Sequence, residues 1–192
     1  AANFDTGYVI DKSITISGES DQIVFDGGIT VTNGAKVTLS NLSINRYSDE
    51  LNCIQVRKHS SLIANGISLI NHANTGQNYP IIYVDGESTA KFDNLYIKKS
   101  NIKDGYHRIY VENANLEISN GNLNCKVFLL KGKAHLQNII INYSDGNAID
   151  IRQKSSLNLQ NVNITGGVAA KIFPCLYSDN SIFISLDFRN GL

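Results

Sequence analysis

The stretch LQNIIIN, residues 136–142, returns later in the chain as LQNVNIT, residues 159–165. In both copies an Asn interrupts an apolar, β-branched run. Asn is uncommon in strands because its side chain competes for backbone hydrogen bonds and because it tolerates the left-handed conformation. The same interruption in two copies therefore indicates a repeated structural position.

The frame apolar-x-apolar-x-Asn-apolar-x-apolar recurs along most of the chain, at residues 37–44, 90–97, 116–123, 134–141 and 157–164. Residues 14–18 and 62–69 fit the same frame with Gly in place of Asn. Because Gly and Asn enter the left-handed region at the lowest cost, this interchange predicts a positive φ at the shared site. The sites follow one another at intervals of roughly 18 to 28 residues, and they are Gly18, Asn41, Gly66, Asn94, Asn120, Asn138 and Asn161.

A short apolar strand precedes each frame from the second onward, at residues 29–31, 54–56, 82–84, 109–111, 127–129 and 149–151. Each repeat therefore predicts three short strands, with a left-handed bend between the second and the third. The interval between repeats is typical of a solenoid rather than of hairpins. An antiparallel β-sandwich with turns at the Asn residues is the alternative, but the constant phase of the frame argues against it.

These repeats resemble the right-handed parallel β-helix of the pectin-lyase-like superfamily, whose coils carry a stacked asparagine ladder at this kind of bend. The resemblance extends from about Tyr8 to Phe188. It implies an all-β fold with one domain, residues 1–192, built as a single-stranded solenoid of about eight coils with an Asn/Gly ladder. An Asn at such a bend can bond the equivalent group one coil away. We therefore expect a column inside the bend that contains Asn94, Asn120, Asn138 and Asn161.

Composition limits the partners of the chain. Its 192 residues are 42% hydrophobic and carry no net charge, so nothing favours nucleic acid or an anionic membrane. No apolar run approaches the roughly 20 residues that span a bilayer, and we expect no membrane insertion. Cys53, Cys125 and Cys175 lack metal-ligand spacing and are expected to be small buried residues. Coil spacing places Cys53 and Cys125 about 14 Å apart, too far for a disulfide.

The first strand of each coil should direct its middle residue outward, because alternate side chains of a strand point to opposite faces. These outward residues are Thr30, Gln55, Tyr83, Tyr110, Phe128 and Asp150. The outward neighbours that follow them are Arg57, Asp85, Glu112, Leu130 and Arg152. Three aromatic side chains from consecutive coils are thus predicted to stack on one solvent-exposed face.

Two long connections, residues 71–81 and 98–108, directly precede the aromatic coils and are placed to wall a groove. Flat aromatic rings suit sugar rings, and the resemblance implies that this face holds polysaccharide in related enzymes. We expect carbohydrate, or another host or cell-surface ligand, to contact Tyr83, Tyr110, Phe128, Tyr79, Tyr106, His107, Asp85 and Glu112. The alternative is a structural stack covered by a loop or by a partner subunit.

Catalysis would fall to Asp85 and Glu112, which are expected on neighbouring coils and near enough for the pair of carboxylates that glycosidases use, with Arg152 two coils further on. Arg57 begins the same row, however, and such a row is also typical of an ordinary charge ladder on a solvated face. The polygalacturonase segments Asn-Thr-Asp, Asp-Asp, Gly-His-Gly and Arg-Ile-Lys are absent. The calcium cluster of pectate lyases is imitated only loosely by Asp85, Glu112 and Asp150. We therefore expect no enzyme activity and no cofactor, with calcium as a weak option.

The two ends, residues 1–12 and 181–192, show no helical pattern that would cap a solenoid. This predicts a continuation of the solenoid in a longer chain, or end-to-end self-association. We expect a secreted or cell-surface binding scaffold of the adhesin or passenger type. A polysaccharide lyase or hydrolase is one alternative, and an assembly module such as a spike segment is another. Unpaired cysteines leave an injected or cytosolic protein open as well.

Overall fold

The computed structural model describes residues 7–19, 23–48, 51–72, 79–98, 108–144, 146–166, 168–173 and 183–187, the last two ranges by main chain only. All regular elements in these residues are strands, and they pair in parallel. One sheet, here called the first sheet, contains β1 (Tyr8–Ile10), β4 (Ile29–Val31), β6 (Ile54–Val56), β8 (Ile82–Asp85), β10 (Arg108–Glu112), β12 (Lys126–Leu130), β14 (Asn147–Arg152) and β16 (Val168–Phe173).

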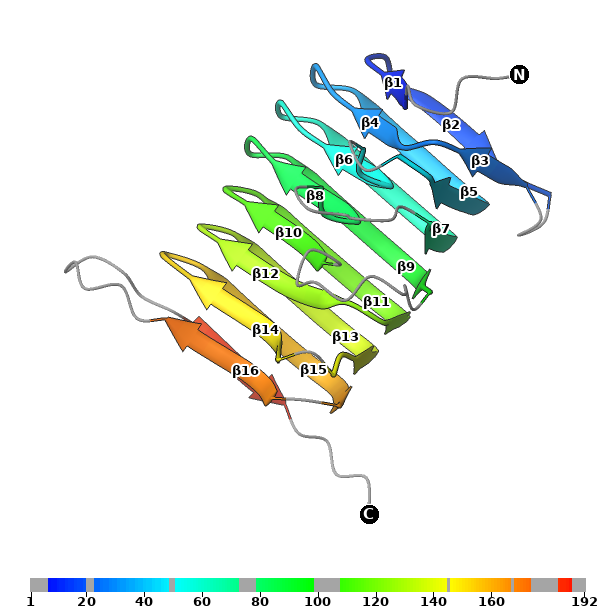
Figure 1. Cartoon of the computed structure of the whole chain (residues 1–192). Coiled ribbons are helices and arrows are strands. Elements are labelled where there is room, and N and C mark those ends of the chain that lie inside the picture. Colours follow the sequence, from blue (N-terminus) through cyan, green and yellow to red (C-terminus); the bar gives the residue numbers. More distant parts are fainter. Residues whose placement is uncertain are drawn as a thin grey trace.

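The second sheet contains β2 (Ile14–Ser17), β5 (Lys36–Arg46), β7 (Ser61–Asn71), β9 (Thr89–Ile97), β11 (Asn115–Leu123), β13 (Lys133–Asn142), β15 (Ser156–Thr165) and β17 (Phe183–Asp187). The short strand β3 (Val24–Asp26) pairs with β5 outside this order. The chain alternates between the two sheets, and each time it returns to a sheet it adds the neighbouring strand. This arrangement is a parallel β-solenoid (Figure 1).

The solenoid has about six full coils, from β4–β5 to β14–β15, whereas about eight were expected. Beyond these coils, β1 and β16 continue the first sheet at its two ends, and β2 and β17 continue the second. Coils follow the order of the sequence along the stack, from the blue to the orange strands (Figure 1). The predicted fold class is therefore confirmed, with a small difference in coil number.

The predicted bend lies within each long strand of the second sheet. φ is positive, between 50° and 64°, at Asn41, Gly66, Asn94, Asn120, Asn138 and Asn161. The prediction was wrong at Gly18, which is not among the positive-φ residues of the described chain. There β2 ends at Ser17, and β3 supplies the pairing partner for the second half of β5, so the first coil does not need the bend.

An asparagine ladder links the bends of successive coils. Asn138 Nδ2 donates to Asn120 Oδ1 over 3.1 Å, and Asn161 Nδ2 donates to Asn138 Oδ1 over 2.9 Å. These side chains are solvent-exposed, so the expected position inside the bend was wrong. The bend turns its convex side outward, and an Asn at that point projects away from the core.

The ladder changes partners where the sequence departs from Asn. Asn94 Nδ2 donates over 3.1 Å to Asn65 Oδ1. The bend of the preceding coil holds Gly66, which has no side chain that could accept this bond. Asn120 Nδ2 donates over 2.7 Å to Asp93 Oδ1 rather than to Asn94. Asn94 Nδ2 also donates to Asp93 Oδ2 over 3.2 Å, so hydrogen bonds connect the column from Asn65 to Asn161, although it is not a pure Asn–Asn stack.

Stacked aliphatic side chains fill the interior. Ile54, Ile82, Ile109, Val127 and Ile149 are in register on successive coils and are almost completely buried. Burying each such side chain contributes about 1.5–3 kcal/mol of transfer free energy. Because each coil buries its apolar side chains against the next coil, the core is one continuous column.

Several turns between the first and second sheets carry a buried serine that the sequence frame did not reveal. Ser60, Ser88 and Ser155 are buried there. Their hydroxyls accept backbone N–H groups of the preceding coil over 3.1–3.2 Å, as in the bond from Gly34 N to Ser60 Oγ. These bonds satisfy amides that the tight turn would otherwise bury without a partner.

Cys53 and Cys125 are buried free cysteines, as expected. Burial raises the pKa of the Cys53 thiol to about 12 and also raises the pKa of the Cys125 thiol. Cys175 lies outside the described residues. The described part of the chain contains no helix of the length and hydropathy needed to cross a bilayer.

Candidate functional site

The outward row of the first sheet is placed as the sequence predicts. Tyr83 pairs with Tyr110, and Tyr110 pairs with Phe128, on the consecutive strands β8, β10 and β12. Glu112 pairs with Asp85 in the neighbouring outward row. Strand alternation and parallel register thus bring these five residues together on one surface, here called the first-sheet face.

The three aromatic rings do not form one flat platform. The Tyr83 and Tyr110 rings are stacked, with centroids 5.2 Å apart and an interplanar angle of 12°. Tyr110 and Phe128 instead meet edge to face, with centroids 4.9 Å apart and an angle of 81°. Phe128 is only 8% exposed. Because the stacked rings cover one face of each other and Arg108 lies over Tyr110, Tyr83, which lines the neighbouring hollow, is the ring that a flat ligand can reach.

Cationic side chains cover Phe128. The guanidinium carbons of Arg152 and Arg108 lie 4.7 and 5.3 Å from the centre of its ring. Arg108 also lies 5.1 Å from the centre of the Tyr110 ring. These are cation–π distances, so the arginines hold both the position and the burial of the aromatic side chains.

Glu112 anchors the tyrosine pair. The Tyr83 hydroxyl donates to Glu112 Oε2 over 2.7 Å. Burial raises the pKa of the Tyr83 hydroxyl, and the bond to Glu112 raises it further. Burial and the Glu112 charge also raise the pKa of Tyr110, while Arg108 opposes them. Both phenols therefore stay protonated over the physiological range, and the single proton of Tyr83 is the one donated to Glu112.

An open hollow of about 680 Å³ lies beside Tyr83, lined by Arg57, Lys58, His59, Tyr83, Asp85, Gly86, Glu112 and Asn113. The outward row supplies only Arg57, Tyr83, Asp85 and Glu112. The other residues come from the turns that follow β6, β8 and β10, where the backbone has positive φ. His59 Nδ1 lies 3.5 Å from Glu87 Oε2 at the rim. Sequence reasoning missed this turn edge, although the polar stretches after each first strand were a signal for it.

Asp85 has a perturbed acidity within this hollow. Burial raises the pKa of its carboxyl, and the nearby Glu112 charge raises it as well, while Arg57 and a Tyr83 hydrogen bond lower it. The neighbouring carboxylates and Arg57 thus form the predicted charge row. Their arrangement provides hydrogen-bond acceptors beside an aromatic surface, together with one cation.

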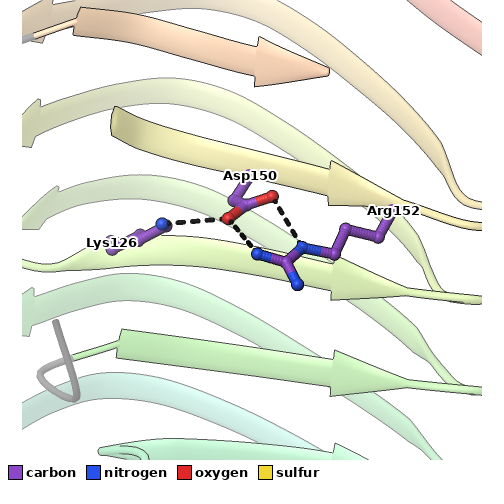
Figure 2. A network of polar contacts seen from close by, with 3 residues as sticks. All are labelled: Lys126, Asp150 and Arg152. Carbon is purple, nitrogen blue, oxygen red and sulfur yellow. Dashed lines mark hydrogen bonds and ion pairs between the residues drawn. The ribbon is translucent and has the colours of Figure 1, made fainter. Parts of the chain in front are cut away.

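Asp150 and Arg152 do not belong to that acidic pair. Asp150 was expected to face solvent but is only 2% exposed. Lys126 Nζ lies 3.1 Å from Asp150 Oδ2, and Arg152 reaches the carboxylate through Nε and Nη2, each at 3.2 Å (Figure 2). Two cations offset the cost of burying this charge. Arg152 is therefore held by Asp150, two coils from Glu112.

Most of the two long connections, residues 73–78 and 99–107, lies outside the described residues. Tyr79 is 38% exposed, and its backbone carbonyl accepts a hydrogen bond from Nη1 of the buried Arg46 over 2.6 Å. The next carbonyl, of Pro80, accepts from Asn52 Nδ2 over 2.5 Å. The segment is therefore attached to the coils before it. Tyr106 and His107 lie outside the described residues.

Among the residues with described side chains, no three or more His, Cys, Asp or Glu residues gather as a metal site requires. No protein-family model, curated protein sequence or solved structure is significantly similar to the chain.

Proposed function

We propose that this β-solenoid is a non-catalytic binding scaffold that holds carbohydrate on its first-sheet face. On this proposal it is a secreted or cell-surface protein of the adhesin or passenger type, built like the right-handed pectin-lyase-like β-helices. The observation that supports it best is the Tyr83–Tyr110 stack, which lies beside an open hollow lined by carboxylate and basic side chains.

The chemistry of this surface suits a sugar. The apolar face of a pyranose ring packs on an aromatic ring, and each such contact adds about 1 kcal/mol. Asp85 and Glu112 can accept hydrogen bonds from hydroxyl groups, and Arg57 can donate to ring or hydroxyl oxygens. The hollow is open to solvent, so part of a larger glycan can enter it.

An enzyme is the second candidate, because the raised pKa of Asp85 beside Glu112 is what a general acid needs. Two contacts favour binding instead. Glu112 already accepts a hydrogen bond from the Tyr83 hydroxyl, and Arg152 is occupied by Asp150. Among the described residues, Asp85 and Arg57 therefore lie together in the hollow beside a Glu112 carboxylate that is already engaged by Tyr83.

A glycan array tests the proposal. The double variant Tyr83→Ala, Tyr110→Ala should lose retention of every glycan that the wild-type chain binds. Tyr96→Ala is the matched control, because Tyr96 is 43% exposed on β9 of the second sheet. Equal retention by wild type and the double variant would refute a sugar surface and would favour the assembly module.

A further inference from the structure

We infer that the bound sugar is electrically neutral, and that Arg57 and Asp85 together recognise one of its hydroxyl groups, with Arg57 as the donor and Asp85 as the acceptor. This inference rests on the proposed function. It adds the charge class of the ligand and names the two side chains that select for it. Sugars that carry a carboxylate or a sulfate ester are then bound less strongly than their neutral counterparts.

Hydrogen bonds between successive turns hold the edge of the hollow in place. His59 N donates to Gly86 O over 2.9 Å, and Glu87 N donates to Asn113 O over 2.7 Å. The turns also lie close together, because a Cβ atom added at Gly86 would lie 3.1 Å from Lys58 N. The backbone of this edge is therefore ordered before a ligand arrives, and little conformational entropy is lost there on binding.

Arg57 lies at the end of β6 and lines the hollow as a half-buried side chain. Its backbone N–H donates to Val31 O over 2.9 Å, which fixes the start of the side chain. In the described part of the chain, its Nε is shielded from solvent and has no hydrogen-bond partner. A guanidinium carries five N–H donors. Arg57 therefore has donor capacity that the described residues do not use.

Asp85 is the acceptor beside Arg57 on the next coil. Val56 pairs with Val84 on adjacent strands, and Arg57 and Asp85 directly follow these two residues. The two backbones are therefore about 4.8 Å apart, the spacing of paired strands. A hydroxyl group both accepts and donates a hydrogen bond, so one hydroxyl can bond both side chains. A carboxylate or a sulfate only accepts, and it would leave Asp85 without a donor.

The formal charges around the hollow also favour a neutral ligand. Arg57 and Lys58 supply two positive charges. Asp85 and Glu112 supply two negative charges, and the histidine of the lining has a carboxylate of its own at the rim. An anionic group beside Arg57 would lie near two carboxylates, and like charges placed together weaken binding. A neutral sugar avoids this repulsion, and its apolar face can pack on the Tyr83 ring.

A glycan array with matched neutral and acidic sugars tests this inference. Neutral glycans, among them β-1,3-glucan, β-1,4-glucan and β-1,4-mannan, are each placed beside a C6-oxidised counterpart, in which the primary hydroxyl has become a carboxylate. We expect the wild-type chain to be retained by neutral glycans. Each of these should retain it about tenfold more strongly than its oxidised counterpart, because the added carboxylate meets Asp85 and Glu112.

Variants of the two residues separate recognition from support of the fold. Arg57→Gln should weaken retention by the neutral glycan about tenfold, as expected for loss of a hydrogen bond from a charged group. Arg57→Lys should recover only part of it, because an ammonium does not reproduce the geometry of a guanidinium. Asp85→Asn removes a charge that repels the oxidised glycan, so it should narrow the difference between the pair. A residue that only supported the fold would weaken both glycans alike.

Lys133→Gln is the matched control, since it removes a positive charge from an exposed position on β13 of the second sheet. If it weakens retention as much as Arg57→Gln, or if Asp85→Asn leaves the difference between paired glycans unchanged, the inference is wrong. Stronger retention by the oxidised glycans, or retention by acidic glycans alone, would overturn the inference and leave the proposed function standing. Absence of retention on every arrayed glycan would overturn both.

Discussion

Replacing Asn138 tests the physical basis of the ladder, because two separate effects meet at this residue. Its backbone has φ of 54°, a conformation that strains most residues with a Cβ atom. Its side chain donates to Asn120 and accepts from Asn161. Asn138→Ala loses both the favourable conformation and the two bonds, whereas Asn138→Gly loses the bonds alone.

The expected costs follow from these contacts. An Ala in the left-handed conformation costs about 1–2 kcal/mol. The two hydrogen bonds are exposed, and water can replace the lost partners, so each contributes about 0.5 kcal/mol, at the low end of the usual range. We therefore expect Asn138→Ala to lower the free energy of unfolding by about 2–3 kcal/mol, and Asn138→Gly to lower it by about 1 kcal/mol.

Urea unfolding followed by circular dichroism measures both changes, provided that the dependence on urea is the same in all variants. Asn113 gives a control, because it has φ of 48° in a turn outside the ladder. Asn113→Gly should leave the stability nearly unchanged. If Asn138→Gly is as stable as the wild-type chain, the ladder bonds contribute nothing. If Asn138→Ala is no less stable than Asn138→Gly, the argument from positive φ is wrong.

Three further predictions concern activity, pH and the thiols. No depolymerisation of uronic-acid, sulfated or neutral polysaccharides is expected, with or without calcium, when reducing ends and ultraviolet absorbance are followed; turnover that disappears in Asp85→Asn or Glu112→Gln would establish an enzyme. Because the folded chain raises the pKa of Asp85, the charged carboxylate costs stability above that pKa and the cost vanishes below the ordinary value of 3.8. Thermal melts should therefore show Asp85→Asn at least as stable as wild type at neutral pH, with the difference closing as the pH falls through that range; a less stable variant at neutral pH contradicts this. Cys53 and Cys125 should not react with a thiol reagent at pH 8 until the chain is unfolded, because burial keeps both thiols protonated; rapid labelling of the folded chain at either residue would show that its burial is wrong.

The sequence alone was sufficient to predict the architecture of the coil. The interchange of Asn and Gly at one phase predicted the positive φ at Asn41 and at Gly66, and the structure has it at both. Strand alternation predicted the outward register of Tyr83, Tyr110 and Phe128. These features are local, because backbone conformational preference and the two-residue period of a strand depend only on neighbouring residues.

Other features depended on contacts between coils. Phe128 and Asp150 occupy the predicted outward positions and are nevertheless buried. Arg108 and Arg152, from the two adjacent coils, lie over Phe128. Lys126 from the adjacent coil and Arg152 from the same strand bind Asp150. The two-residue period of a strand predicts which way a side chain points, but it does not predict which other side chains will cover that residue.

The ladder and the hollow likewise combine features that the sequence predicted with features that depend on contacts between coils. The sequence predicted that the Asn side chains of successive bends would bond one another, and several do. Only the tertiary structure showed that they lie on the outer side of the bend, and that Lys58, His59 and Asn113 join Asp85 at one edge. Local chemistry determines the conformation of each turn. Stacking in three dimensions determines which turns become neighbours, and therefore which side chains can act together.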